Sequence, residues 1–217
     1  MESLQDALDD PEILGQMACA FDIFVTIYFT IIAVMAFKSE DRENVNIDTY
    51  IHSLGFSSAL FMYSYLIADS YIWLAGVVGI ALYGISVVIS LIGLESKKVS
   101  LTNLAITSLL VGSLIGGTLY MSQSWSSEDV NTSYSIGLLT LACVRATAEL
   151  PKLIKALKGM QSSDSRIKII GNLLKAITEI FWLIYFLAKK DYYTMAMCGI
   201  VSTLFASKLF LGLFGHE

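Results

Sequence analysis

Residues 143–214 decide the fold of this chain, because they combine long apolar runs with a few regularly spaced charges. They read CVRATAELPKLIKALKG (143–159), MQSSDS (160–165), RIKIIGNLLKAITEIFWLIYFLAKKDYY (166–193) and TMAMCGIVSTLFASKLFLGLF (194–214). The first and third runs predict two helices joined by a polar turn, and the fourth predicts another apolar helix. Arg145 and Glu149 lie on one helical face, and Lys175 and Glu179 repeat their spacing of four on the next helix.

If the first two helices form an antiparallel hairpin about Ser162, their charges meet at equal depth. Arg145 and Glu179 are each 17 residues from Ser162, and Glu149 and Lys175 are each 13 residues from it. A lone charge costs roughly 2.5–3.5 kcal/mol in the hydrocarbon of a bilayer, so such residues pair or face the protein interior. We therefore predict that these four side chains form a charged seam between two packed membrane helices.

The composition of the whole chain is that of a membrane protein. Of its 217 residues, 55% are hydrophobic and only 15% are charged, and the mean hydropathy is +0.66. Soluble domains carry about 25% charged residues. Only helices and closed barrels satisfy the backbone in lipid, and the long apolar runs lack the alternation of barrel strands. The sequence therefore predicts an all-α fold, a polytopic integral membrane helix bundle with six or seven membrane helices.

Seven apolar segments are long enough to span about 30 Å of hydrocarbon. They cover residues 16–37, 52–73, 74–94, 101–121, 134–157, 168–188 and 193–214. An acidic segment, 1–15, precedes the bundle of 16–217, and Asp10-Pro11-Glu12 within it predicts a helix start. Within the bundle we expect a first helical group (16–94), a linking helix (101–121) and a second helical group (134–214). Basic residues gather in the loops after the first, third and fifth segments, which predicts that those loops and the C-terminus face the cytoplasm.

Four segments carry a resemblance to a known family. Tyr65, Asp69 and Trp73 are spaced by four and followed by Gly79; further along, the chain reads RATAELPKL (145–153), NLLKAITE (172–179) and CGIVST (198–203), which contains Gly199. In this order, the segments resemble the signature of the peroxin 11 family of peroxisome-proliferation membrane proteins, of which the kinetoplastid glycosomal integral membrane proteins are a divergent branch. The chain departs from the family at Ala146, at Glu179 and in its acidic N-terminus.

The resemblance implies a protein, not an enzyme, that maintains, elongates and multiplies peroxisomes or glycosomes, with metabolite passage as a second role. It implies a location in the membrane of that organelle, with another endomembrane as the alternative. The implied partners are membrane lipids, further copies or related family members, and organelle-division or membrane-protein import factors. Under this interpretation Tyr65, Asp69 and Trp73 share one helical face, and the apolar run from Ser53 to Leu94 breaks near Gly76.

The alternative is a seven-helix transporter, in which that run breaks at Asp69-Ser70. An offset of 120 residues pairs Tyr65 with Tyr185 and Gly79 with Gly199. At the same offset, Phe61, Ala68 and Ile80 are each paired with a residue of the same type. This offset predicts a plan of three, one and three helices, which resembles sugar and PQ-loop transporters. Pro151-Lys152 lies where those proteins have Pro-Gln, but Val78 and Cys198 occupy the places of their substrate-binding Asn.

The remaining charged residues and motifs point to no chemistry of their own. A basic loop with Lys155, Lys158, Arg166 and Lys168 faces anionic lipid or an import receptor in our interpretation. Lys208, in the last apolar segment, is interpreted as a lysine that reaches for the membrane interface. The net charge of −5 gives no indication of nucleic acid as a partner. No catalytic set, phosphate loop or metal spacing appears, so no enzyme activity and no cofactor are expected.

Overall fold

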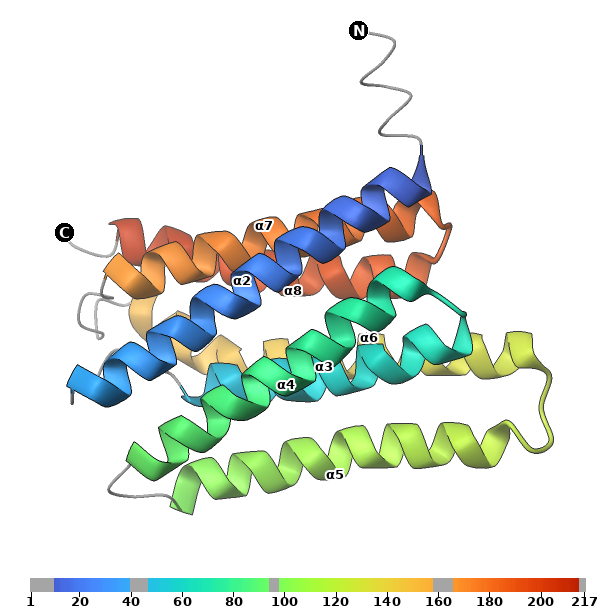
Figure 1. Ribbon diagram of the computed structural model, residues 1–217, viewed down its shortest axis with the longest axis horizontal. Coiled ribbons are helices and arrows are strands. Elements are labelled where there is room, and N and C mark those ends of the chain that lie inside the picture. The colour runs from blue at the N-terminus through green and yellow to red at the C-terminus, as the bar shows by residue number, and fades with distance from the viewer. Residues whose placement is uncertain (1–9, 40–46, 94–97, 158–165, 215–217) are drawn as a thin grey trace, which may run out of the picture. The chain divides into compact units, whose positions relative to one another are not determined.

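The chain is an all-α, multi-pass membrane protein. The computed structural model describes residues 10–39, 47–93, 98–157 and 166–214, which form seven helices and no strand (Figure 1). They are α2 (Pro11–Ser39), α3 (Ile47–Leu66), α4 (Ser70–Gly93), α5 (Lys98–Met121), α6 (Ser127–Leu157), α7 (Arg166–Ala188) and α8 (Tyr192–Phe214). Within this part of the chain, five helices are long and apolar enough to cross a membrane: α2, α4, α5, α7 and α8.

The number of membrane helices depends on α3 and α6, which are more polar than the other five. Helix α6 carries Arg145 and Glu149 in its second half, and α3 contains four serines and the residue His52. Six or seven crossings therefore remain a prediction. At its start α2 follows the predicted pattern: Pro11 is the first helical residue, and the Glu12 N–H donates to Asp10 Oδ1 at 2.8 Å.

The helices divide into two compact units, and each is described here by itself. Unit 1 comprises the described residues of Met1–Ala18 and Ser135–Glu217, and unit 2 comprises those of Cys19–Tyr134. The boundaries fall inside α2 and α6. The expected linking helix, α5, packs against α3 and belongs to unit 2, so the division differs from the helical groups expected from the sequence.

Unit 2 is built on the helix hairpin α3–α4, to which α2 adds polar contacts. Its core contains Ala33, Ile47, Tyr50, Ile51, Tyr83 and Val87. The Thr26 hydroxyl donates to the Tyr83 hydroxyl at 3.3 Å, and the Ser86 hydroxyl donates to Thr30 Oγ1 at 3.2 Å. The interior of unit 2 is thus held by aliphatic and aromatic packing and by hydroxyl groups that form hydrogen bonds between α2 and α4.

The two helices of the α3–α4 hairpin approach closely at a glycine. A Cβ added to Gly76 would lie 2.9 Å from the Cα of Phe61, an atom of the opposing backbone. Three residues later, a Cβ on Gly79 would lie 2.8 Å from Ser57 Cβ. In the α7–α8 hairpin, the helices do not approach so closely at Gly199. A Cβ added there would lie 3.5 Å from Leu183 Cδ1, an ordinary contact distance. Gly76 and Gly79 are therefore required by packing, whereas Gly199 has room for a methyl group.

This difference gives a prediction with an internal control. Gly76→Ala forces the backbones of α3 and α4 apart, and overpacking of this kind costs about 1–3 kcal/mol. Gly199→Ala adds a methyl group at an ordinary contact distance and gains about 1 kcal/mol of helix propensity. We expect the unfolding temperature in detergent to fall for the first variant and to hold or rise for the second. Equal effects of the two substitutions would contradict the close approach at Gly76.

Candidate functional site

The turn between α3 and α4 closes the first hairpin. Helix α3 ends at Leu66, Ala68 has a left-handed backbone with φ of 53°, and α4 begins at Ser70. The Asp69 N–H donates to the Ser64 carbonyl at 2.9 Å, the six-residue bond of a Schellman motif. Asp69 Oδ1 then accepts from the Ile72 N–H at 3.2 Å, so the same residue caps the next helix.

The turn between α7 and α8 has the same construction, 122 residues later. Helix α7 ends at Ala188, Lys190 has a left-handed backbone with φ of 58°, and α8 begins at Tyr192. The Asp191 N–H donates to the Phe186 carbonyl at 3.0 Å, and Asp191 Oδ1 accepts from the Thr194 N–H at 3.2 Å. Each element of the first turn thus has a counterpart in the second at one constant offset.

Burial follows the same offset of 122. Buried residues 63, 72, 75, 76, 79 and 83 correspond to buried residues 185, 194, 197, 198, 201 and 205. The offset of 120 expected from the sequence is wrong, because it pairs Tyr65, which is 75% exposed, with Tyr185, which is 1% exposed. The correct counterpart of Tyr185 is Tyr63, which is 3% exposed. The corrected offset also pairs Cys198 with Gly76 and not with Val78.

The contacts between the first and third helices of each set of three correspond as well. In unit 2, Tyr83 and Ser86 of α4 contact α2 through Thr26 and Thr30. Their counterparts on α8 at the offset of 122 are Phe205 and Lys208, and both contact α6. The Arg145 guanidinium carbon lies 5.2 Å from the centroid of the Phe205 ring, and Lys208 Nζ lies 2.8 Å from Glu149 Oε2. Helices α2–α3–α4 and α6–α7–α8 are therefore two copies of one three-helix arrangement, separated by α5.

The second copy differs from the first in its chemistry. Where unit 2 pairs hydroxyl groups, unit 1 places an ion pair and a guanidinium. Arg145, Glu149 and Lys175 are each about 7% exposed or less, although their helices are otherwise apolar. The Nε atom of Arg145 is buried without a hydrogen-bond partner, while other atoms of that residue make contacts. The predicted pairs Arg145–Glu179 and Glu149–Lys175 stay predictions.

Lys208 is the functional candidate whose environment the sequence analysis misjudged. It was expected to reach for the membrane interface, but its side chain is only 18% exposed and bonds Glu149. Its ammonium group also lies 5.6 Å from the centroid of the Phe205 ring. Its position on one face of α8 with Phe205 could have indicated this environment, since residues three apart are neighbours on a helix.

The aromatic signature does not form one helical face. Tyr65 ends α3, Asp69 lies in the turn and Trp73 belongs to α4, so the expected shared face and the expected break near Gly76 are both wrong. The chain breaks at residues 67–69, where the transporter interpretation placed the break. Asp69 caps α4, and the Trp73 ring lies 6.2 Å from that of Phe61. In the basic loop, Lys158 and the side chains of Lys155, Arg166 and Lys168 lie outside the described residues.

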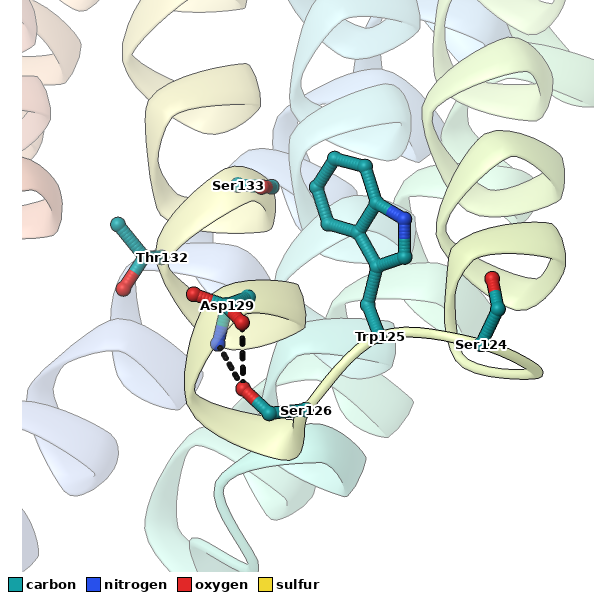
Figure 2. Close-up of a pocket in the computed structure, with 6 residues that line it drawn as sticks. All are labelled: Ser124, Trp125, Ser126, Asp129, Thr132 and Ser133. Carbon is teal, nitrogen blue, oxygen red and sulfur yellow. Dashed lines mark hydrogen bonds between the residues drawn. The ribbon is translucent and has the colours of Figure 1, made fainter.

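A groove lies at the start of α6 in unit 2 (Figure 2). It has a volume of about 480 Å³ and is lined by Ser124, Trp125, Ser126, Asp129, Thr132 and Ser133. Figure 2 shows the Ser126 hydroxyl at Asp129, where it donates to Oδ2 at 2.6 Å and accepts from the Asp129 N–H at 3.2 Å. These bonds form the cap of α6, which explains the polar side chains there. No group of three metal-binding side chains occurs among the described residues.

Comparison with known proteins assigns the chain to no family. No protein-family model matches it, and no curated protein matches it. What the fold defines is a class: a multi-pass membrane protein in which a three-helix arrangement occurs twice, once with neutral and once with charged interior contacts.

The matching turns lead to a prediction about their left-handed residues. A residue with a Cβ pays about 1–2 kcal/mol for this backbone conformation, whereas glycine adopts it freely. We expect Ala68→Gly and Lys190→Gly each to raise stability by about 1 kcal/mol in a detergent unfolding assay. As a control, Ala81→Gly, at an exposed position inside α4, should lower stability by about 1 kcal/mol. A loss of stability at both turn positions would contradict the repeated turn.

The ion pair leads to a second prediction. Lys208→Met leaves the Glu149 carboxylate in an apolar interior, and an uncompensated buried charge costs about 3–5 kcal/mol. We expect a loss near the lower value, because Lys208 is partly exposed. Exchanging both residues, Glu149→Gln with Lys208→Met, should recover most of the loss, as measured by unfolding in detergent.

The matched control for this pair lies in unit 2. Ser86→Ala removes the counterpart of Lys208, a neutral hydroxyl whose hydrogen bond contributes about 1 kcal/mol. If Lys208→Met cost no more than Ser86→Ala, the Glu149–Lys208 pair would not be part of the folded interior.

Proposed function

We propose that the chain is a transporter that carries a small polar solute across a membrane through two three-helix repeats joined by α5. The observation that carries this proposal is the correspondence of the two repeats at the offset of 122, which includes the turns, the buried positions of the second and third helices, and the residues of α4 and α8 that contact the first helix. Repeated helical units on either side of a linking helix are a common plan of secondary transporters, in which the repeats move against each other around a solute site.

The dissimilar interiors of the repeats support a role beyond membrane anchoring. Charges inside a membrane are costly, and where they occur they mark solute pathways or proton relays by default. In unit 2, the corresponding contacts between α2 and α4 are made by the hydroxyl groups of Thr26, Thr30, Tyr83 and Ser86. The charges of unit 1 are therefore not needed to form the arrangement, and a solute pathway is the function that best accounts for them.

Solute counterflow tests this proposal. Purified protein is reconstituted into liposomes that are loaded with one unlabelled solute, and entry of the same labelled solute is followed. We test a neutral sugar, a cationic amino acid and small organic anions. A transporter accelerates entry of the label when its solute is inside, whereas a pore or a leak does not. The proposal fails if, for every solute tested, entry of the label is no faster into loaded proteoliposomes than into unloaded ones.

A role in multiplying peroxisomes or glycosomes is the second candidate. It is supported by the resemblance to the peroxin 11 family and by the burial of Arg145, Glu149 and Lys175, which lie in two of the family-like segments. A tagged copy should then mark these organelles, and excess protein should change their number or shape. Labelling of another endomembrane with unchanged peroxisomes would leave the transporter proposal as the remaining one.

A further inference from the structure

We propose that the groove at the start of α6 binds the ammonium group of a zwitterionic phospholipid headgroup. The groove has a volume of about 480 Å³, which falls within the range of about 300–1,000 Å³ that is usual for small-molecule sites. It is lined by an exposed tryptophan, a carboxylate and several hydroxyl groups, at one end of a helix long and apolar enough to cross a membrane. The inference concerns a lipid site in unit 2 and goes beyond the proposed function, because it does not depend on transport.

Backbone hydrogen bonds position the aromatic ring and the carboxylate of this groove. Trp125 follows the end of α5, where its N–H donates to the Met121 carbonyl at 2.9 Å. Asp129 lies in the first turn of α6, and its N–H donates to the Ser126 hydroxyl at 3.2 Å. Figure 2 shows the Trp125 ring beside α6 next to Ser133, and Asp129 one turn nearer the start of that helix. The ring and the carboxylate are therefore held on one groove before any ligand binds.

The cap of α6 uses only part of the polar groups in the groove. It consists of the Ser126 hydroxyl and one oxygen of the Asp129 carboxylate, Oδ2, which accept and donate as described above. The second oxygen, Oδ1, and the hydroxyl groups of Ser124, Thr132 and Ser133 take no part in this cap. Trp125 is 52% exposed. The groove thus presents acceptors and an aromatic face beyond what the start of the helix requires.

The charges near the groove favour a cation. Glu128 and Asp129 are both acidic and lie in the first turn of α6. The partial positive charge of a helix N-terminus is about half a unit, so the two carboxylates exceed it. Residues 99–144 contain no Lys or Arg. Lys98 begins α5, whose 24 residues place it about 36 Å from the end at which the groove lies.

The neighbouring helix of unit 2 supplies no basic residue either. Helix α3 contacts the start of α6, because the Tyr134 hydroxyl donates to the Ala59 carbonyl at 2.7 Å and the Tyr134 ring stacks on that of Tyr63. Residues 43–96, which include α3 and α4, contain no Lys or Arg. The turn between these two helices adds another acid, Asp69. This end of unit 2 is therefore acidic in every helix that meets there.

Exposed aromatic rings place the groove at the level of lipid headgroups. Tyr120 and Trp125 are exposed at the end of α5, and Tyr65 and Trp73 are exposed at the turn between α3 and α4. Both connections lie at the same end of unit 2 (Figure 1). Trp and Tyr are enriched at the membrane–water interface, where their rings lie among the headgroups. A lipid headgroup is therefore the ligand that is present at this depth.

An ammonium group is the part of a headgroup that fits these side chains. The face of a tryptophan ring attracts a cation, and a carboxylate nearby adds to that attraction. The N–H groups of ethanolamine donate to hydroxyl oxygens such as those of Thr132 and Ser133. An anionic headgroup would meet like charge at Glu128 and Asp129. A metal ion is not indicated, since no group of three metal-binding side chains occurs in the described part of the chain.

Lipid preference provides the test. Purified protein is placed in mixed micelles of detergent with phosphatidylethanolamine or with phosphatidylglycerol, and bound lipid is counted by native mass spectrometry. Phosphatidylglycerol has a hydroxylated headgroup without the ammonium group. We expect half occupancy at a roughly tenfold lower mole fraction of phosphatidylethanolamine, the combined effect of one carboxylate and one aromatic ring on a cation.

Two substitutions in the groove and two outside it separate this site from general charge and from the other exposed rings. Asp129→Asn removes the charge but keeps an acceptor for the Ser126 hydroxyl, and it should reduce the preference about fivefold. Trp125→Leu should reduce the preference by about twofold to fivefold. Glu128→Gln removes an equal charge beside the groove, and screening should keep its effect within about twofold. Trp73→Leu removes an exposed ring of α4 and should leave the preference unchanged.

Equal occupancy by the two lipids would overturn the inference, and so would equal losses for Asp129→Asn and Glu128→Gln. Free ethanolamine, added at the total lipid concentration, should not displace phosphatidylethanolamine. Displacement would assign the groove to a soluble amine and overturn the lipid headgroup as its ligand. If Trp125→Leu does not fold, Asp129→Asn decides the question, because it retains the cap of α6. Solute counterflow is measured separately, so the transporter proposal and the lipid site can each fail while the other holds.

Discussion

The structure depends on one constraint: a chain that turns back inside or beside a membrane must satisfy its own backbone at the turn. The last carbonyls of one helix and the first N–H groups of the next lack partners within their helices. The α3–α4 and α7–α8 hairpins both meet this requirement with a left-handed residue followed by aspartate. The backbone N–H of that aspartate closes the first helix, and its carboxylate caps the second. A single residue thus serves two helix ends, which permits a connection of only three residues.

Once the turn fixes the register of a hairpin, packing between its helices follows. Positions at one offset from the two aspartates are buried in both hairpins, although the side chains differ. Gly76 and Cys198 occupy equivalent buried places, as do Tyr83 and Phe205. The first hairpin brings its backbones together at glycine, whereas the second carries a cysteine at that place. The same backbone arrangement therefore accommodates side chains of different volume at equivalent buried positions. The geometry of the turn identifies the repeat more clearly than the types of its core residues do.

The repeats differ most where the first helix of each meets the third. Neutral hydroxyl groups make this contact in unit 2, and charged groups make it in unit 1. A buried ion pair is weak evidence for stability, because its desolvation cost can exceed the attraction between the charges. The hydroxyl version shows a less costly solution within the same chain. The difference between the two copies is therefore the observation that supports our proposal of a solute pathway in unit 1.

The sequence by itself determined the class of the protein and the approximate helices. Apolar runs of about 20 residues have no stable form in lipid other than a helix, so composition and length were sufficient. The spacing of Arg145, Glu149 and Lys175 marked residues that the structure buries. The sequence did not determine where the long run from Ser53 to Leu94 breaks, because Asp69 reads equally well as a polar residue on a helical face and as a helix cap. Only the tertiary structure decided this, by placing Ala68 in a left-handed conformation and Asp69 at the cap. It likewise decided the partner of Lys208 and the offset of 122, because contacts between helices depend on rotation and register, which hydropathy does not encode.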